Sequence, residues 1–106
     1  GVYINSKYVN GKIVNDLVYV DESTKERKTI LTQKEINEKF EFTLDDEHTI
    51  NLAESAIIGN EIYVTLDYGV HYSQEDMGWR YAYKRQKTVC FKYNTDTKEI
   101  TELYKF

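Results

Sequence analysis

The sequence predicts an all-β protein in which seven to nine short antiparallel strands form meanders. These meanders build a small sandwich or a partly open barrel, with at most one short helix. Short runs rich in Tyr, Ile and Val follow one another along the chain, and turn sequences separate them. Ten of the 106 residues are tyrosines, which favour strands, and proline is absent.

The first hairpin is predicted close to the N-terminus. Asn10-Gly11 lies between two strand-like runs, Val2–Val9 and Lys12–Val20. Asn-Gly is the preferred pair for a type I′ turn, because both central residues need a positive φ. The polar residues that follow lead into a third strand over Arg27–Thr32.

The segment that begins at Thr32 is open to two interpretations. Thr32 and Glu35 have the spacing of a capping box, and Ile36 and Phe40 lie four residues apart. This pattern predicts about two turns of helix, from Thr32 to Phe40. The alternative is a strand that continues to Leu44.

A further pairing is predicted between Phe40–Leu44 and Thr49–Leu52. The four residues between them bunch three carboxylates with the imidazole of His48. Carboxylate oxygens suit a hard cation such as Ca²⁺. Adjacent residues of a turn point apart, however, and no metal-loop pattern matches, so a solvated turn is favoured and no metal site is predicted.

The second half of the chain has the clearest alternation. Gly59-Asn60 predicts a tight turn, and the residues after it alternate between apolar and polar, as in a strand with one buried face. The apolar positions of this strand and of a later one are Ile62, Val64, Leu66, Tyr68, Val89, Phe91 and Tyr93.

The last predicted strand follows the turn at residues 94–97. Its apolar residues Ile100 and Leu103 fall on opposite faces of a regular strand. This strand is therefore either buried on both sides or interrupted by a bulge.

The C-terminal half also resembles a known kind of repeat. Ala56–Tyr68, followed by Val89–Phe106, is similar to one blade of the β-propeller-type repeats of bacterial surface proteins and lipoproteins. The resemblance covers Ser55–Phe106 and implies a four-stranded meander. The chain has room for two blades at most, whereas a closed propeller needs about four or more. We therefore expect a fragment, an oligomer or, preferably, a different all-β fold with the same meanders.

Length and charge limit the remaining possibilities. The 106 residues predict one β-rich domain over 1–106. Because the sequence starts at Gly1, we expect a processed form, a trimmed form or a fragment of a larger protein. No apolar run reaches the roughly 20 residues that span a bilayer. The net charge of −4 disfavours a generic nucleic-acid binder, which is usually basic.

No residue pattern predicts catalysis or a cofactor. Cys90 lies between apolar neighbours in a predicted strand, so we expect a packed thiol. His71, Glu75 and Asp76 share the interval Gly69–Gly78, where a mixed polar loop is favoured over an acid–base site. The sequence lacks a phosphate-binding loop, a nucleophile elbow and paired metal ligands, so no enzyme activity, cofactor or metal is predicted.

The segment from Trp79 to Lys87 has the strongest functional signal, because it combines four positive charges with three aromatic residues on an acidic protein. Trp, Tyr and Arg dominate binding hot spots. The competing interpretation is a strand with its aromatic residues in the core and its lysines in water. The predicted binding residues are His71, Trp79, Arg80, Tyr81, Tyr83 and Arg85.

These observations predict a non-catalytic binding module that recognises a protein or a carbohydrate. The favoured setting is the extracytoplasmic part of a bacterial envelope protein. The alternative is a small cytoplasmic inhibitor or immunity-type protein that blocks a partner enzyme. The third hypothesis is a hydrolase-type enzyme that uses His71 and carboxylates.

Overall fold

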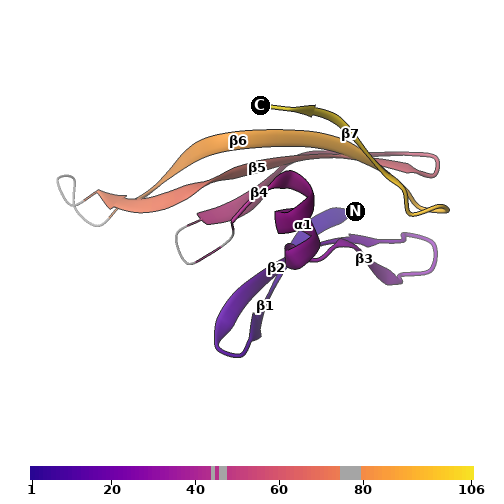
Figure 1. The fold of residues 1–106 in the computed structure, drawn as a ribbon. Helices are drawn as coiled ribbons and strands as arrows, with labels where there is room; N and C mark the ends of the chain where they lie inside the picture. The colour runs from indigo at the N-terminus through magenta and orange to yellow at the C-terminus, as the bar shows by residue number, and fades with distance from the viewer. Residues whose placement is uncertain (44, 46–47, 75–79) are drawn as a thin grey trace.

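The protein folds into two antiparallel sheets and one helix (Figure 1). The structure is a computed structural model that describes residues 1–43, 45, 48–74 and 80–106, and it describes the backbone alone at residues 71–74 and 80–82. The three-stranded sheet has the order β1-β2-β3, and the four-stranded sheet has the order β4-β5-β6-β7. The elements are β1 (Val2–Val9), β2 (Lys12–Val20), β3 (Arg27–Leu31), α1 (Gln33–Phe40), β4 (His48–Ile58), β5 (Glu61–Gln74), β6 (Arg80–Asn94) and β7 (Ile100–Lys105). The predicted all-β, sandwich-like class is confirmed.

The β1–β2 hairpin has the predicted boundaries and the predicted turn. Val9 pairs with Lys12, so Asn10 and Gly11 are the two central residues of the turn. Their φ angles are 52° and 78°, as a type I′ turn requires. The Asn-Gly pair therefore sets the register of the whole hairpin.

The helical interpretation of the segment after Thr32 is confirmed. The Thr32 hydroxyl accepts a hydrogen bond from the Glu35 backbone N–H, and the Glu35 carboxylate accepts one from the Thr32 backbone N–H. This capping box satisfies the free N–H groups at the helix start. Ile36 and Phe40 are both fully buried, so the predicted apolar face points into the core.

The alternative strand to Leu44 and the predicted pairing of Phe40–Leu44 with Thr49–Leu52 are both wrong over the described residues, and Leu44 itself lies outside them. The helix runs to Phe40 and ends at Glu41, which takes a left-handed conformation with φ 57°. A residue in this conformation stops both the helix and any strand that would continue from it. The β4 strand pairs with β5 instead, with Ile50 opposite Tyr68.

Each end of α1 is bonded to a different sheet. At the start, the buried Asp16 of β2 accepts the Gln33 backbone N–H at 3.0 Å, and Lys7 approaches the same carboxylate to 3.0 Å. At the end, the ammonium group of Lys105 on β7 donates to the Phe40 carbonyl oxygen at 2.7 Å. The helix therefore connects the three-stranded sheet to the four-stranded sheet.

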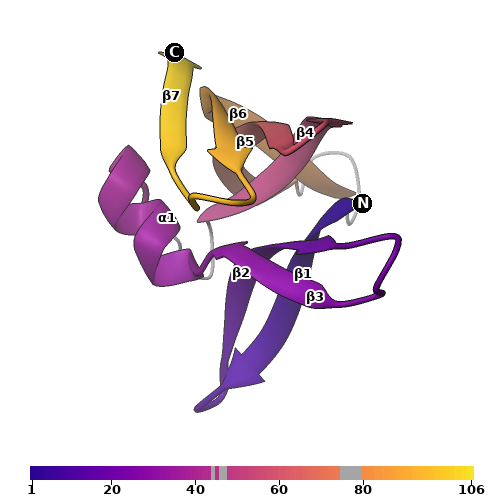
Figure 2. The ribbon, with the colours of Figure 1, turned by 90° about the vertical axis from the view of Figure 1, so that its right-hand side faces the viewer.

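The core lies between the two sheets, with α1 along one side (Figure 2). The alternating apolar residues of β5 and β6 are all buried, as predicted. Tyr19 of β2 meets Tyr93 of β6 with ring centroids 6.1 Å apart, and Phe40 stacks on Phe91 at 5.2 Å. The aromatic contacts thus join both sheets and the helix.

The last strand carries a bulge, which is one of the two predicted alternatives. Phe91 of β6 pairs with Glu102, while its neighbour Cys90 pairs with Tyr104, so Leu103 is an extra residue in β7. Leu103 is 45% exposed. A bulge therefore explains the broken alternation, and burial on both sides does not.

Replacing Gly11 with Val should destabilise the protein by about 1–2 kcal/mol, because a β-branched residue is strained at a φ of 78°. No heavy atom lies within 4 Å of a Cβ built at this position, so the effect would come from backbone strain alone. Chemical denaturation measures it. Gly11→Asn is the control and should lose much less, because Asn tolerates the left-handed region. Equal losses in both variants would contradict the explanation.

Candidate functional site

The β5–β6 hairpin extends beyond both of its neighbours. The β4 strand pairs with β5 only as far as Val70, opposite His48, whereas β5 and β6 continue pairing to Gln74 and Arg80. In the described part of the chain, the last four pairs have no third strand beside them. This two-stranded end, residues 71–74 and 80–83, is called the β5–β6 extension, and Figure 1 shows it projecting from the sheet.

The extension corrects one prediction from the sequence. The interval after Gly69 was expected to be a loop, but β5 continues through it to Gln74. His71 therefore lies in a strand, where its backbone pairs with Tyr83. Glu75 and Asp76 lie outside the described residues.

The predicted binding residues lie on or beside this extension. His71, Arg80 and Tyr81 occupy paired backbone positions, and their side chains are outside the described part of the structure. Trp79 lies entirely outside the described residues. Tyr83 and Arg85 are described in full, so the analysis of contacts begins with them.

A bulge marks the point at which the extension leaves the sheet. Tyr68 pairs with Lys87 and Gly69 pairs with Arg85, which leaves Gln86 as an extra residue in β6. A bulge bends its strand and increases the local twist. Figure 1 shows the two strands curving away from the rest of the sheet.

Tyr83 packs tightly over Gly69. A Cβ at residue 69 would collide with the Lys84 carbonyl oxygen and would lie 2.8 Å from the hydroxyl oxygen of Tyr83. Only glycine therefore permits this approach of the tyrosine ring and the β6 backbone. Tyr83 is half-buried, which gives this predicted binding residue a packing role in the hairpin.

The surroundings of Tyr83 keep its hydroxyl protonated. Burial raises the pKa of this phenol above its ordinary value of 10.0, and the Asp67 carboxylate adds to the increase. A hydrogen bond with the Asn51 side chain and the positive charge of Arg85 act in the opposite direction. The phenol therefore stays neutral to a higher pH in the folded protein than in the unfolded chain.

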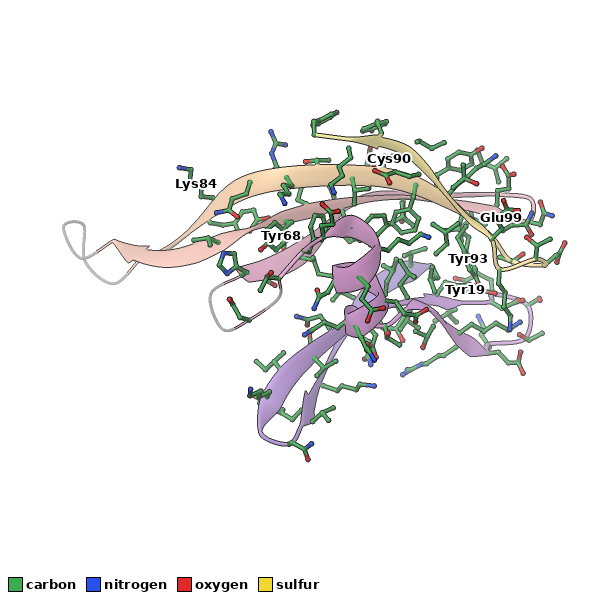
Figure 3. The ribbon with its side chains drawn as sticks, viewed as in Figure 1. Tyr19, Tyr68, Lys84, Cys90, Tyr93 and Glu99 are labelled. Atoms are coloured by element: carbon green, nitrogen blue, oxygen red, sulfur yellow. The ribbon has the colours of Figure 1, made fainter. Side chains whose placement is uncertain are left out.

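Positive charge gathers at the root of the extension. Lys84 and Arg85 are exposed, and Figure 3 shows the Lys84 side chain extending outward from β6. The Lys87 ammonium lies 5.9 Å from the ring centroids of both Phe42 and Tyr68. As consecutive strand residues, Lys84 and Arg85 place positive charge on opposite faces of β6, and Lys87 adds a third charge beside the Phe42 and Tyr68 rings.

An aromatic stack supports the same root from the inner side. The Phe42 and Tyr68 rings stack with centroids 4.5 Å apart, and the His48 ring also stacks on Tyr68, at 5.6 Å between centroids. The Tyr68 hydroxyl donates to the Thr43 carbonyl oxygen at 2.9 Å. The root is therefore held by rings from β4, β5 and the segment after α1.

Sequence reasoning missed Gly69, the Gln86 bulge and the Phe42–Tyr68 stack. Gly69 did carry a signal, since an isolated glycine at the end of an alternating strand indicates a close backbone approach. The bulge and the stack depend on which strands pair and in which register. Neither property can be read from the local pattern alone.

The other chemical candidates occupy structural positions. His48 begins β4, and its Nδ1 lies 2.8 Å from the Asp45 carboxylate. Among the residues that the structure describes, no group of three or more metal-ligating side chains is found. Cys90 is 8% exposed, which confirms the prediction of a packed thiol, and its hydrogen bond with Tyr104 raises the pKa of that phenol.

Comparison with protein-family models, curated proteins and solved structures finds no match for this chain. In the described part of the structure, no helix has the length and apolar character needed to cross a bilayer.

Replacing Gly69 with Ala should destabilise the protein by about 1–3 kcal/mol, because the added methyl group forces β5 and β6 apart. The comparison is made by denaturation in the wild type and in a Tyr83→Ala background. The loss should persist when the tyrosine is absent, since the Lys84 carbonyl oxygen also blocks the methyl group. A loss that disappears with Tyr83→Ala would mean that the ring alone makes the contact.

The raised pKa of Tyr83 predicts a stability difference at high pH. Below the ordinary pKa of 10.0 the phenol is protonated in both states, and its contribution is fully present. Above that pH the unfolded state ionises first, so the wild type should lose stability faster than Tyr83→Phe. Denaturation of both proteins between about pH 8 and pH 11 tests this prediction. If the free energy of unfolding falls equally with pH in both proteins, the pKa of Tyr83 is not raised by folding.

Proposed function

We propose that the protein is a non-catalytic binding module whose binding surface is centred on the β5–β6 extension. The observation that carries this proposal is the length of the hairpin, which pairs four residues further than β4 reaches and further still beyond β7, whose pairing with β6 stops at Val89. An isolated two-stranded ribbon is marginally stable in water, so the extension adds little to folding. We therefore assign the extension to the binding of a partner, which would cover the ribbon.

The residue types at the extension suit recognition of an anionic or sugar-bearing partner. Trp79 is the proposed anchor, Tyr81 supplies a stacking surface and Arg80 pairs with an acidic group. The exposed Lys84 and Arg85 at the root add positive charge that steers such a partner toward the extension. Tyr83 supports the surface by packing on Gly69. A protein and a carbohydrate both fit this chemistry.

We propose the outside of a bacterial cell envelope as the setting. The segment that resembles β-propeller-type blades of surface proteins and lipoproteins, Ser55–Phe106, lies within the four-stranded meander of β4 to β7. The same projecting ribbon favours one alternative function. A cytoplasmic inhibitor or immunity-type protein could insert such a ribbon into the cleft of an enzyme and block it.

The double variant Trp79→Ala/Arg80→Ala tests the binding surface. The probes are an array of immobilised acidic oligosaccharides and acidic peptides. The wild type should bind members of the array, and the double variant should lose that binding because its anchor and its guanidinium group are gone. Thermal melting measures whether the variant still folds.

Lys34→Ala is the matched control, since it removes an exposed positive charge from α1. This control should bind as the wild type does. A folded double variant that still binds would place the surface elsewhere, and a double variant that unfolds would make Trp79 a packing residue. Failure of the wild type to bind any acidic probe would contradict the proposed partner chemistry.

A further inference from the structure

The far end of the β1–β2 hairpin exposes an unusual amount of apolar surface. Tyr8 is 78% exposed, Ile13 is 54% exposed and Val9 is 44% exposed. Every residue from Ser6 to Ile13 is exposed, and this stretch is called the hairpin tip. Figures 1 and 2 show it projecting from the body of the protein, in a direction different from that of the β5–β6 extension.

Apolar side chains lie on both faces of the hairpin tip. Tyr8 pairs with Ile13, so these two share one face, whereas Val9 pairs with Lys12 on the other. A partner protein with a one-sided groove would cover only one of these faces. An apolar medium that surrounds the tip covers both, and the interface of a lipid bilayer is such a medium.

The charges of the tip point to an anionic surface. Within the hairpin tip the charged residues are Lys7 and Lys12, and the tip has no aspartate or glutamate, although the whole chain has a net charge of −4. Lys7 is paired with the buried Asp16, so Lys12 supplies the positive charge that the tip presents. Lysine side chains can keep their ammonium groups at the level of lipid phosphates while their stems contact apolar surface. Each lysine near an anionic membrane contributes attraction that ordinary salt only partly screens.

The tip is also held in one shape before any contact. The Asn10-Gly11 turn fixes its end, and at its base Lys7 is bonded to the buried Asp16 at 3.0 Å. A preorganised tip loses little conformational freedom when it docks. A small buried apolar area therefore contributes more to the free energy of binding than it would on a flexible loop.

We propose that the hairpin tip docks the protein on an anionic lipid surface. Tyr8, Val9 and Ile13 enter the zone between headgroups and acyl chains, and Lys12 contacts the lipid phosphates. This is a peripheral and reversible contact. It uses a surface separate from the β5–β6 extension and leaves that extension available to its own partner.

Sedimentation with lipid vesicles tests the proposal. The wild type should bind vesicles of equimolar phosphatidylglycerol and phosphatidylcholine, and it should bind pure phosphatidylcholine vesicles much more weakly. Tyr8→Ser/Ile13→Ser should reduce binding to the anionic vesicles about tenfold or more, because two apolar side chains are lost from the contact. Lys12→Gln should weaken the binding and reduce its dependence on salt.

The matched control is Ile57→Ser/Ile58→Ser, which removes two apolar residues that are 49% and 66% exposed at the end of β4. It should bind the anionic vesicles as the wild type does. Equal losses in the control and in the tip variant would overturn the proposal. So would a wild type that ignores anionic vesicles, in which case an acidic groove on a protein would be the better occupant.

A fluorescence measurement covers the case in which the tip variant fails to fold. In a Trp79→Phe background, Tyr8→Trp places the single indole of the chain at the tip, and its emission should shift to shorter wavelength and be quenched by brominated phosphatidylglycerol vesicles. Ile58→Trp should show neither effect. Quenching that is the same at both positions would contradict insertion of the tip.

Discussion

The arrangement of the two sheets depends on the bonds at the ends of α1. The buried Asp16 carboxylate receives the first backbone N–H of the helix, and Lys105 donates to its last carbonyl oxygen. A buried carboxylate without such partners would be costly, so the position of the helix on β2 is strongly determined. Because one short helix is tied to both sheets, the sheets are fixed relative to each other as well as packed together.

The same connection reaches the candidate binding surface. The chain that leaves α1 places Phe42 against Tyr68, at the root of the β5–β6 extension. The Lys87 and Lys105 ammonium groups both lie 5.9 Å from the centroid of the Phe42 ring. Cation–π contacts from β6 and β7 therefore hold the segment that supports the extension. The projecting ribbon starts from one of the more firmly held parts of the fold.

Local patterns in the sequence predicted much of this architecture. The Asn10-Gly11 pair gave the first hairpin its correct boundaries, and the capping box at Thr32 identified the helix, since both signals act within a few residues. The turn at Gly59-Asn60 after Ile58 was predicted, whereas the continuity of β4 from Thr49–Leu52 to Ile58 was missed, because the last residues of this strand are exposed and do not alternate. At the candidate site the residue types were recognised, whereas the extension and the packing of Tyr83 on Gly69 depend on long-range register.

The accessibility of the Cys90 thiol can be used to measure how often the edge strand β7 opens. This thiol, the single one in the chain, is 8% exposed and lies opposite Tyr104 of the edge strand β7. A thiol reagent gains access when β7 separates from β6, so the rate of labelling measures how often this strand detaches in the native state. Lys105 belongs to the same strand, so each such event also frees one end of α1. Chemical labelling of one cysteine would thus follow the mechanical coupling between an edge strand and the helix.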